Sequence, residues 1–261
     1  MEISRNLWCV LGSALAASIT AAHGEILPFT QTRSVDADAT ATVPGVVTTD
    51  SDSDAALDFS FFDAEVAPSA ISLVASRGLF AFSQGVGKQT SGIADFGIAG
   101  QGEASVSMTL VPGAGVSGNA SGNSLFDVVF TLTKLSTFNL LGNVDTQGIV
   151  TGGATLPTMS NDFVFEDVDN AITLFDSLTS DESFSASGTL PPGTYRIYAT
   201  ADVASTQLAS LSATRTLTGI SSFDFDFRVA TVQIPEAGTL GAAGAVLGLC
   251  GLTLAARRRR A

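Results

Sequence analysis

Histidine, cysteine and tryptophan are almost missing from this chain of 261 residues, which has one His, two Cys and one Trp. All four lie near the ends, at Trp8, Cys9, His23 and Cys250. Residues 25–235 therefore offer no histidine for a Ser-His-Asp triad, no thiol nucleophile and no His or Cys ligand for zinc. They also lack the cysteines for a disulfide, so their fold must depend on its own core.

Basic residues are scarce as well, with 12 Lys and Arg against 25 Asp and Glu in the whole chain. Residues 25–235 hold 7 basic and 23 acidic side chains, which gives a net charge of −16. Because phosphate recognition needs a basic face, nucleic acid is not expected among the partners. Such a surface also repels anionic partners unless divalent cations bridge the two.

Apolar residues, by contrast, are plentiful: 45% of the chain is hydrophobic and 17 residues are Phe. This content is enough to build a core and excludes wholesale disorder. The length favours one large domain or two small ones.

Residues 1–24 have the parts of a secretory signal peptide. Arg5 supplies a positive charge, a short apolar run follows it, and the small residues Ala22 and Gly24 precede the expected cleavage site. We expect signal peptidase to cut between Gly24 and Glu25, with a cut after Ala22 as the alternative.

Residues 233–261 combine a second apolar segment with a basic end. Residues 237–256 contain no charge, and a helix of that length, at about 1.5 Å per residue, spans roughly the 30 Å of a bilayer core. The four residues Arg257, Arg258, Arg259 and Arg260 follow at once. Because such a cluster stays in the cytoplasm, the sequence predicts a single transmembrane helix that leaves the folded part outside.

A short motif, Ile234-Pro235-Glu236-Ala237-Gly238-Thr239-Leu240, precedes the Gly/Ala/Leu-rich span and the arginines. This tail resembles PEP-CTERM, the C-terminal sorting signal of bacteria with an exopolysaccharide envelope, although Ala237 stands for the usual second Pro. The resemblance implies recognition at Pro235, Glu236 and Ala237 by an exosortase, a membrane protease of transpeptidase type. It also implies removal of the tail and delivery to the cell surface or extracellular matrix. A permanent single-span anchor in the inner membrane is the alternative.

Between the two ends, large apolar residues alternate with polar ones, which predicts strands with one buried and one wet face. The clearest examples are residues 105–110, 126–132, 195–203 and 223–229. Further strands are expected near residues 57–63, 70–83, 92–99, 135–141, 161–176 and 182–190. Many strands and short turns predict an all-β fold, an antiparallel β-sandwich of jelly-roll-like type over residues 57–232.

Two local features complete this prediction. Pro192 and Gly193 favour a type II turn, in which Gly193 would have a positive φ. Residues 25–56 form an acidic N-terminal segment, and its stretch 30–54 is rich in Thr, Ser, Asp and Ala. With almost no large apolar side chain, this stretch is expected to be a linker or a long surface loop.

Two acidic groups are candidate calcium sites. Asp50, Asp52 and Asp54 alternate as at the start of a calcium loop, but the EF-hand pattern fails further along. A second patch consists of Glu166, Asp167 and Asp169. Solvated acidic surface is the favoured interpretation of both patches, so no cofactor is predicted, and calcium is the one candidate.

Asp224 and Asp226 lie two residues apart on one predicted strand face, about 7 Å from each other. That separation is within the range of carboxylate pairs that hydrolyse glycosides. A sugar-cleaving cleft also needs aromatic platforms, and residues 25–235 have no Trp and only two Tyr. The wet face of a sandwich strand is therefore the favoured interpretation of the pair.

Together these features predict an exported, non-enzymatic protein of the cell surface or extracellular matrix. Its expected partners are signal peptidase, an exosortase and the inner membrane. The alternative is a module that binds extracellular polysaccharide or another surface, ice included, with calcium as a candidate bridge. A carboxylate-based glycoside hydrolase that uses Asp224 and Asp226 is the remote alternative.

Overall fold

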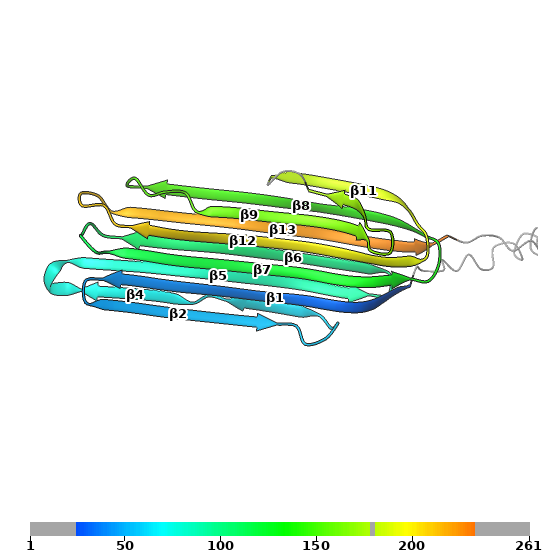
Figure 1. Ribbon diagram of the computed structural model, residues 1–261, viewed down its shortest axis with the longest axis horizontal. Coiled ribbons are helices and arrows are strands. Elements are labelled where there is room, and N and C mark those ends of the chain that lie inside the picture. The colour runs from blue at the N-terminus through cyan, green and yellow to red at the C-terminus, as the bar shows by residue number, and fades with distance from the viewer. Residues whose placement is uncertain (1–24, 178–180, 233–261) are drawn as a thin grey trace, which may run out of the picture. The chain divides into compact units, whose positions relative to one another are not determined.

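The computed structural model describes residues 25–177 and 181–232 (Figure 1). The described strands all belong to one compact unit that ends at Thr231. Residues 1–24, with the signal peptide, and the tail with its sorting motif, apolar span and arginines lie outside the described residues. No helix within the described part is long and apolar enough to cross a membrane.

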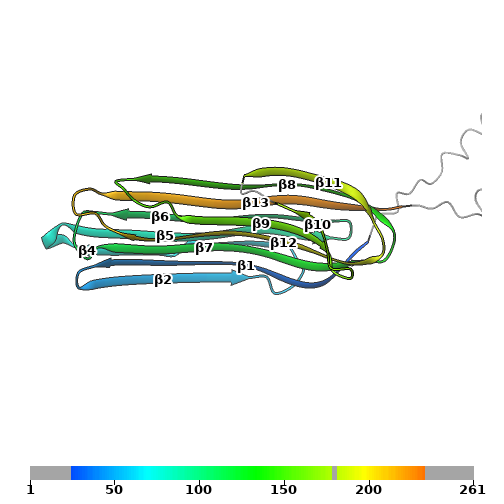
Figure 2. The ribbon, with the colours of Figure 1, turned by 45° about the horizontal axis from the view of Figure 1, so that its top comes forward.

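The described strands form two antiparallel sheets that pack face to face (Figure 2). The six-stranded sheet has, in spatial order, β10 (Ile172–Asp176), β9 (Thr158–Asp167), β12 (Gly193–Leu208), β7 (Ser117–Leu132), β1 (Ile26–Val43) and β2 (Val46–Ala55). The seven-stranded sheet has β11 (Glu182–Leu190), β8 (Ser136–Thr151), β13 (Arg215–Thr231), β6 (Gly97–Leu110), β5 (Leu79–Ala94) and β3 (Phe62–Val66), and β4 (Ser69–Val74) also pairs with β5. The predicted antiparallel β-sandwich is confirmed.

Aromatic residues fill one part of the space between the two sheets. In this part β9, β12 and the adjoining half of β7 in one sheet face β13 and β8 in the other. Phe163, Phe223, Phe225 and Phe227 are almost fully buried there, together with Tyr195. Their ring contacts include a tilted pair, Phe163 and Phe225, with centroids 5.2 Å apart, and a stacked pair, Phe223 and Phe225, with centroids 6.4 Å apart. Large buried rings of this kind contribute strongly to the stability of a core.

Small residues fill another part of this space, where β1 and β7 of one sheet face β5 of the other. There the backbones of the two sheets come close together. The inward positions of β1 include Ala37, Ala39 and Ala41, all buried. On the facing strands Gly85 and Gly122 have no room for a side chain. A Cβ added at Gly85 would lie 2.0 Å from the carbonyl oxygen of Ser121, and one at Gly122 would lie 2.1 Å from that of Val86.

The linker expected over residues 30–54 is wrong, because these residues form most of β1 and β2. In β1 the alternation is between small inward residues and outward Asp, Ser or Thr, so the usual marker of a strand, a large apolar side chain, is missing. The sandwich therefore begins at Ile26 rather than near residue 57.

Other strand predictions hold to different degrees. The four clearest segments lie within β6, β7, β12 and β13, residues 135–141 lie almost wholly within β8, and residues 182–190 coincide with β11. Residues 70–83 instead form parts of β4 and β5 joined by a short 3-10 helix, η1 (Ala75–Arg77), and residues 161–176 divide into β9 and β10. Residues 92–99 contain the turn between β5 and β6, and most of residues 57–63 are loop. The type II turn is also wrong: Gly193 has no positive φ and begins β12, opposite Leu132.

Candidate functional site

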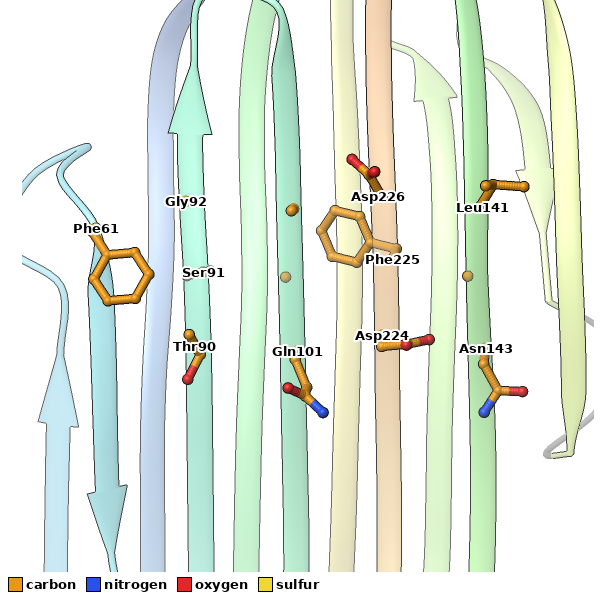
Figure 3. Close-up of a pocket in the computed structure, with 13 residues that line it drawn as sticks. Phe61, Thr90, Ser91, Gly92, Gln101, Leu141, Asn143, Asp224, Phe225 and Asp226 are labelled. Carbon is orange, nitrogen blue, oxygen red and sulfur yellow. The ribbon is translucent and has the colours of Figure 1, made fainter.

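A groove of about 650 Å³ crosses the outer face of the seven-stranded sheet (Figure 3). It extends over four neighbouring strands, β5, β6, β13 and β8, and reaches the loop before β3. Its lining residues are Phe61, Thr90, Ser91, Gly92, Ala99, Gly100, Gln101, Leu141, Gly142, Asn143, Asp224, Phe225 and Asp226. The groove thus contains both members of the carboxylate pair that the sequence singled out.

Strand register aligns four polar residues across this groove. Thr90 is paired with Gln101, Gln101 with Asp224, and Asp224 with Asn143. Since neighbouring strands are about 4.8 Å apart, the four positions make a row roughly 14 Å long. We call this set the polar row.

A second row beside it shapes the floor of the groove. Gly92 is paired with Ala99, Ala99 with Asp226, and Asp226 with Leu141. Because Gly92 and Ala99 have little or no side chain, the surface is low between the larger residues on either side. The hollow is therefore a direct result of two small residues at outward positions.

Apolar side chains lie at the two ends of the groove. Phe61 is 67% exposed, and its Cδ2 lies 3.8 Å from where a Cβ on Gly92 would be. At the other end Leu141 is 49% exposed. Phe61 is an exposed aromatic side chain of the groove, but it lies at the end away from Asp224 and Asp226 (Figure 3).

Hydrogen bonding leaves part of the polar row available to a ligand. Within the described residues, the Gln101 amide and the Asp224 carboxylate have no hydrogen-bond partner. Thr90 donates to Asp63 Oδ1 at 2.9 Å, and Asn143 Oδ1 accepts from Ser183 Oγ at 2.8 Å, which leaves the amide N–H groups of Asn143 unused. Donors and acceptors therefore both face the solvent in the groove.

The neighbouring carboxylate, Asp226, is held by Arg228. The Arg228 Nε atom lies 3.1 and 3.0 Å from the two carboxylate oxygens of Asp226. Phe223, Phe225 and Phe227 alternate with these residues and are buried, so the predicted wet face of this strand is confirmed.

The outer face of the six-stranded sheet is different, because many of its polar groups bond one another. Arg196 donates to both carboxylate oxygens of Asp127, at 2.7 and 2.8 Å, and this bond raises the pKa of Arg196. Asp202 accepts from Asn123 and, at 2.8 Å, from Thr200 Oγ1. A ligand on these strands would have to break existing hydrogen bonds.

Arg33 supports the groove from inside the sandwich. This β1 residue is 1% exposed, and its Nη2 atom donates to the carbonyl oxygens of Asp58 and Ser60 at 2.6 and 2.8 Å. Its Nη1 atom donates to Ser91 Oγ at 3.2 Å. Burial lowers the pKa of Arg33, against the opposing effect of Asp58. These bonds hold the loop that presents Phe61. No sequence pattern indicates them, because Arg33 lies in the segment interpreted as a linker.

The two candidate calcium patches do not gather three acidic side chains at one point. Asp50, Asp52 and Asp54 lie on the extended strand β2, about 7 Å from one to the next. In the second patch Asp167 accepts from Asn170, while Asp169 accepts from the Thr194 amide at 2.8 Å. In the described part of the chain, no three acidic, His or Cys side chains are placed to hold a metal ion.

No family model, curated protein or solved structure matches this chain. The chemistry of the groove must therefore be inferred from its own side chains. The outward polar side chains are two carboxylates, two amides and the Thr90 hydroxyl, with an apolar group at either end.

Proposed function

We propose that this chain is an exported, non-enzymatic protein of the bacterial cell surface or extracellular matrix. The observation that carries the proposal is the order of its segments: a signal peptide, a disulfide-free acidic body, and a tail that resembles PEP-CTERM. In that tail Pro235, Glu236 and Ala237 form the sorting motif, the apolar span enters the inner membrane, and Arg257 to Arg260 stay in the cytoplasm. The antiparallel β-sandwich suits export because residues 25–235 form its core without cysteine and so need no disulfide bond.

The test is to identify the two ends of the mature protein. The full chain is expressed in an exopolysaccharide-producing bacterium that has an exosortase, and surface-associated protein is analysed by mass spectrometry. We expect an N-terminus at Glu25 and a C-terminus close to residue 235. Replacing Pro235 and Glu236 by Ala should keep the arginine-tipped form in the inner membrane. An intact wild-type chain in the cytosol, or one confined to the inner membrane, would contradict the proposal.

A second candidate function is binding of extracellular polysaccharide, and the groove is the observation that favours it. Its free polar groups and apolar ends suit a polyhydroxylated ligand. Hydrolysis by Asp224 and Asp226 remains the remote alternative. If the chain hydrolyses a glycan, replacing both residues by Asn must abolish the activity; unchanged hydrolysis would remove them as catalysts.

A further inference from the structure

We propose that the groove binds a neutral polysaccharide chain that lies across strands β5, β6, β13 and β8. This inference rests on the second candidate function and gives it a site and a ligand class. Gln101, Asp224 and Asn143 bind the hydroxyl groups of the chain, and Phe61 and Leu141 pack against its apolar C–H surfaces.

The free groups of the polar row include both donors and acceptors, as recognition of hydroxyl groups requires. A hydroxyl both donates and accepts, the Asp224 carboxylate only accepts, and the Gln101 amide does both. The unused N–H groups of Asn143 add a donor. Hydrogen bonds to an ionised acceptor are about twice as strong as neutral ones, so Asp224 is the strongest single contact.

The direction of the groove favours a polymer over a single sugar. The polar row runs across the strands for roughly 14 Å, which exceeds the width of one sugar ring. The second row lies parallel to it, with its low floor at Gly92 and Ala99. A chain can therefore lie along the polar row with its backbone over the small residues.

The charges of the site favour a neutral chain. Two carboxylates line the groove, and residues 25–235 carry a net charge of −16. The guanidinium of Arg228 already pairs with Asp226 at 3.0 Å. An anionic polysaccharide would meet repulsion where it crosses β13, which carries both carboxylates.

The loop at the Phe61 end of the site is held in place by hydrogen bonds within the protein. Arg33 holds the backbone of Asp58 and Ser60, directly before Phe61, and also bonds Ser91 in the groove wall. Binding to a preformed site costs less ordering entropy than binding to a loose loop. Arg33 thus acts as a positioning residue for Phe61.

The experiment measures affinity for defined polysaccharides. The full chain is purified in mild detergent from whole cells of an exporting host, so recovery does not depend on sorting. The probes are three neutral polymers (mixed-linkage β-glucan, dextran and galactomannan) and alginate as the anionic comparison. We expect binding to at least one neutral polymer in affinity electrophoresis and calorimetry, and none to alginate.

Variants then locate the binding. Replacing Gln101 and Asp224 together by Ala should weaken binding at least tenfold, while Gln147→Ala, a matched exposed Gln on β8 outside the groove, should change it less than twofold. Ala99→Leu fills the floor and should abolish binding, whereas Ala230→Leu on β13 should not. Because all five positions point outward, the midpoint of thermal unfolding should stay within about 2 °C.

Absence of binding to all three neutral polymers would overturn the inference, as would tighter binding of alginate. Equal affinity of the wild type and the Gln101/Asp224 double variant would do the same. A protein that is sorted but binds none of the polysaccharides contradicts this inference alone. A protein that binds a neutral polysaccharide but is never sorted contradicts only the proposal that the chain is an exported surface or matrix protein.

Discussion

Arg33 of β1 donates a hydrogen bond across the interlayer space to Ser91 of β5, with 3.2 Å between Nη1 and Oγ. The same guanidinium bonds two carbonyl groups of the loop before β3 and lies 5.7 Å from the ring centre of Phe62. A buried charge is tolerated when its donors are satisfied in this way. One side chain therefore joins the two sheets and the loop at the end of the groove.

Replacing Arg33 by Lys should lower the free energy of unfolding by about 2 to 4 kcal/mol, because an ammonium group cannot reproduce the planar fork of donors. Urea unfolding measures the change. The matched control is Arg77→Lys in η1, an exposed position where a change within about 0.5 kcal/mol is expected. Equal effects at the two positions would show that the buried network adds no stability.

The Lys substitution should also weaken polysaccharide binding, and it should do so through Phe61. In a Phe61→Ala background the further loss on adding Arg33→Lys should therefore almost disappear. If the two losses simply add, Arg33 does not act by positioning this ring.

Close approach of the two backbones predicts a strong effect at two glycines. Gly85→Ala and Gly122→Ala place a Cβ about 2 Å from a carbonyl oxygen, so each should cost about 3 kcal/mol or more, or prevent folding. Gly92→Ala on the same strand as Gly85 is the control, because its Cβ meets only Phe61 Cδ2 at 3.8 Å. Tolerance of Ala at Gly85 with an unchanged unfolding midpoint would mean that the layers are further apart than described.

These glycines also explain how far the fold could be predicted from sequence. Alternation reveals a strand when the inward residues are large, as with Phe223, Phe225 and Phe227 in β13. In β1 most inward residues are Ala, so the same alternation is hidden, and in β2 almost every residue is exposed. Residues 30–54 therefore resemble a linker in sequence. The run Asp36-Ala37-Asp38-Ala39 does alternate, and this was the signal that could have identified β1.

The site was predictable only in part, for a different reason. Asp224 and Asp226 share a face because they are two apart on one strand, which is local information. Gln101 and Asn143 become neighbours of Asp224 only through the pairing of β6, β13 and β8. No local pattern encodes that register, and none shows that the loop turns Phe61 outward.

A pH dependence follows from Asp36, an exposed residue on the outer face of β1. Partial burial raises the pKa of its carboxyl, and the nearby charges of Asp38 and Asp202 raise it further. The folded state therefore favours the protonated carboxyl of Asp36. This preference adds to the free energy of unfolding below the usual pKa of Asp, and the contribution is lost as the pH rises through the pKa of Asp36 in the folded state. At pH 7 the ionised Asp36 destabilises the fold.

Asp36→Asn should consequently raise the midpoint of thermal unfolding at pH 7, by an amount equivalent to less than about 1 kcal/mol because water screens the site. At pH 3 the gain should vanish, since the wild-type carboxyl is then protonated as well. Asp95→Asn, in the exposed turn between β5 and β6, is the matched control and should leave the midpoint unchanged. A gain from Asp36→Asn that is as large at pH 3 as at pH 7 would contradict the assignment.

The edge strand β2 accounts for the acidic run that resembled a calcium loop. Among the described strands β2 pairs only with β1, so its other side has no neighbouring strand. The N–H groups of Ser53 and Ala55 donate instead to the carboxylates of Asp52 and Asp54, at 2.9 and 2.8 Å. Asp50, Asp52 and Asp54 are paired with Ala39, Ala37 and Val35, which are buried inward positions of β1. Inward-pointing charges at an edge oppose the addition of a further strand, because pairing would bury them.

Replacing Asp50, Asp52 and Asp54 together by Asn should therefore promote association through β2, visible as dimers or larger species in sedimentation velocity at micromolar protein. The control removes three exposed carboxylates away from this edge, at Asp95, Asp145 and Asp224, and so makes the same change in net charge. Association of the first variant alone would place the effect at the β2 edge. If both variants associate equally, general charge repulsion keeps the wild-type molecules apart, and the acidic residues of the β2 edge have no specific role. If neither variant associates, these residues are not needed to prevent association through β2.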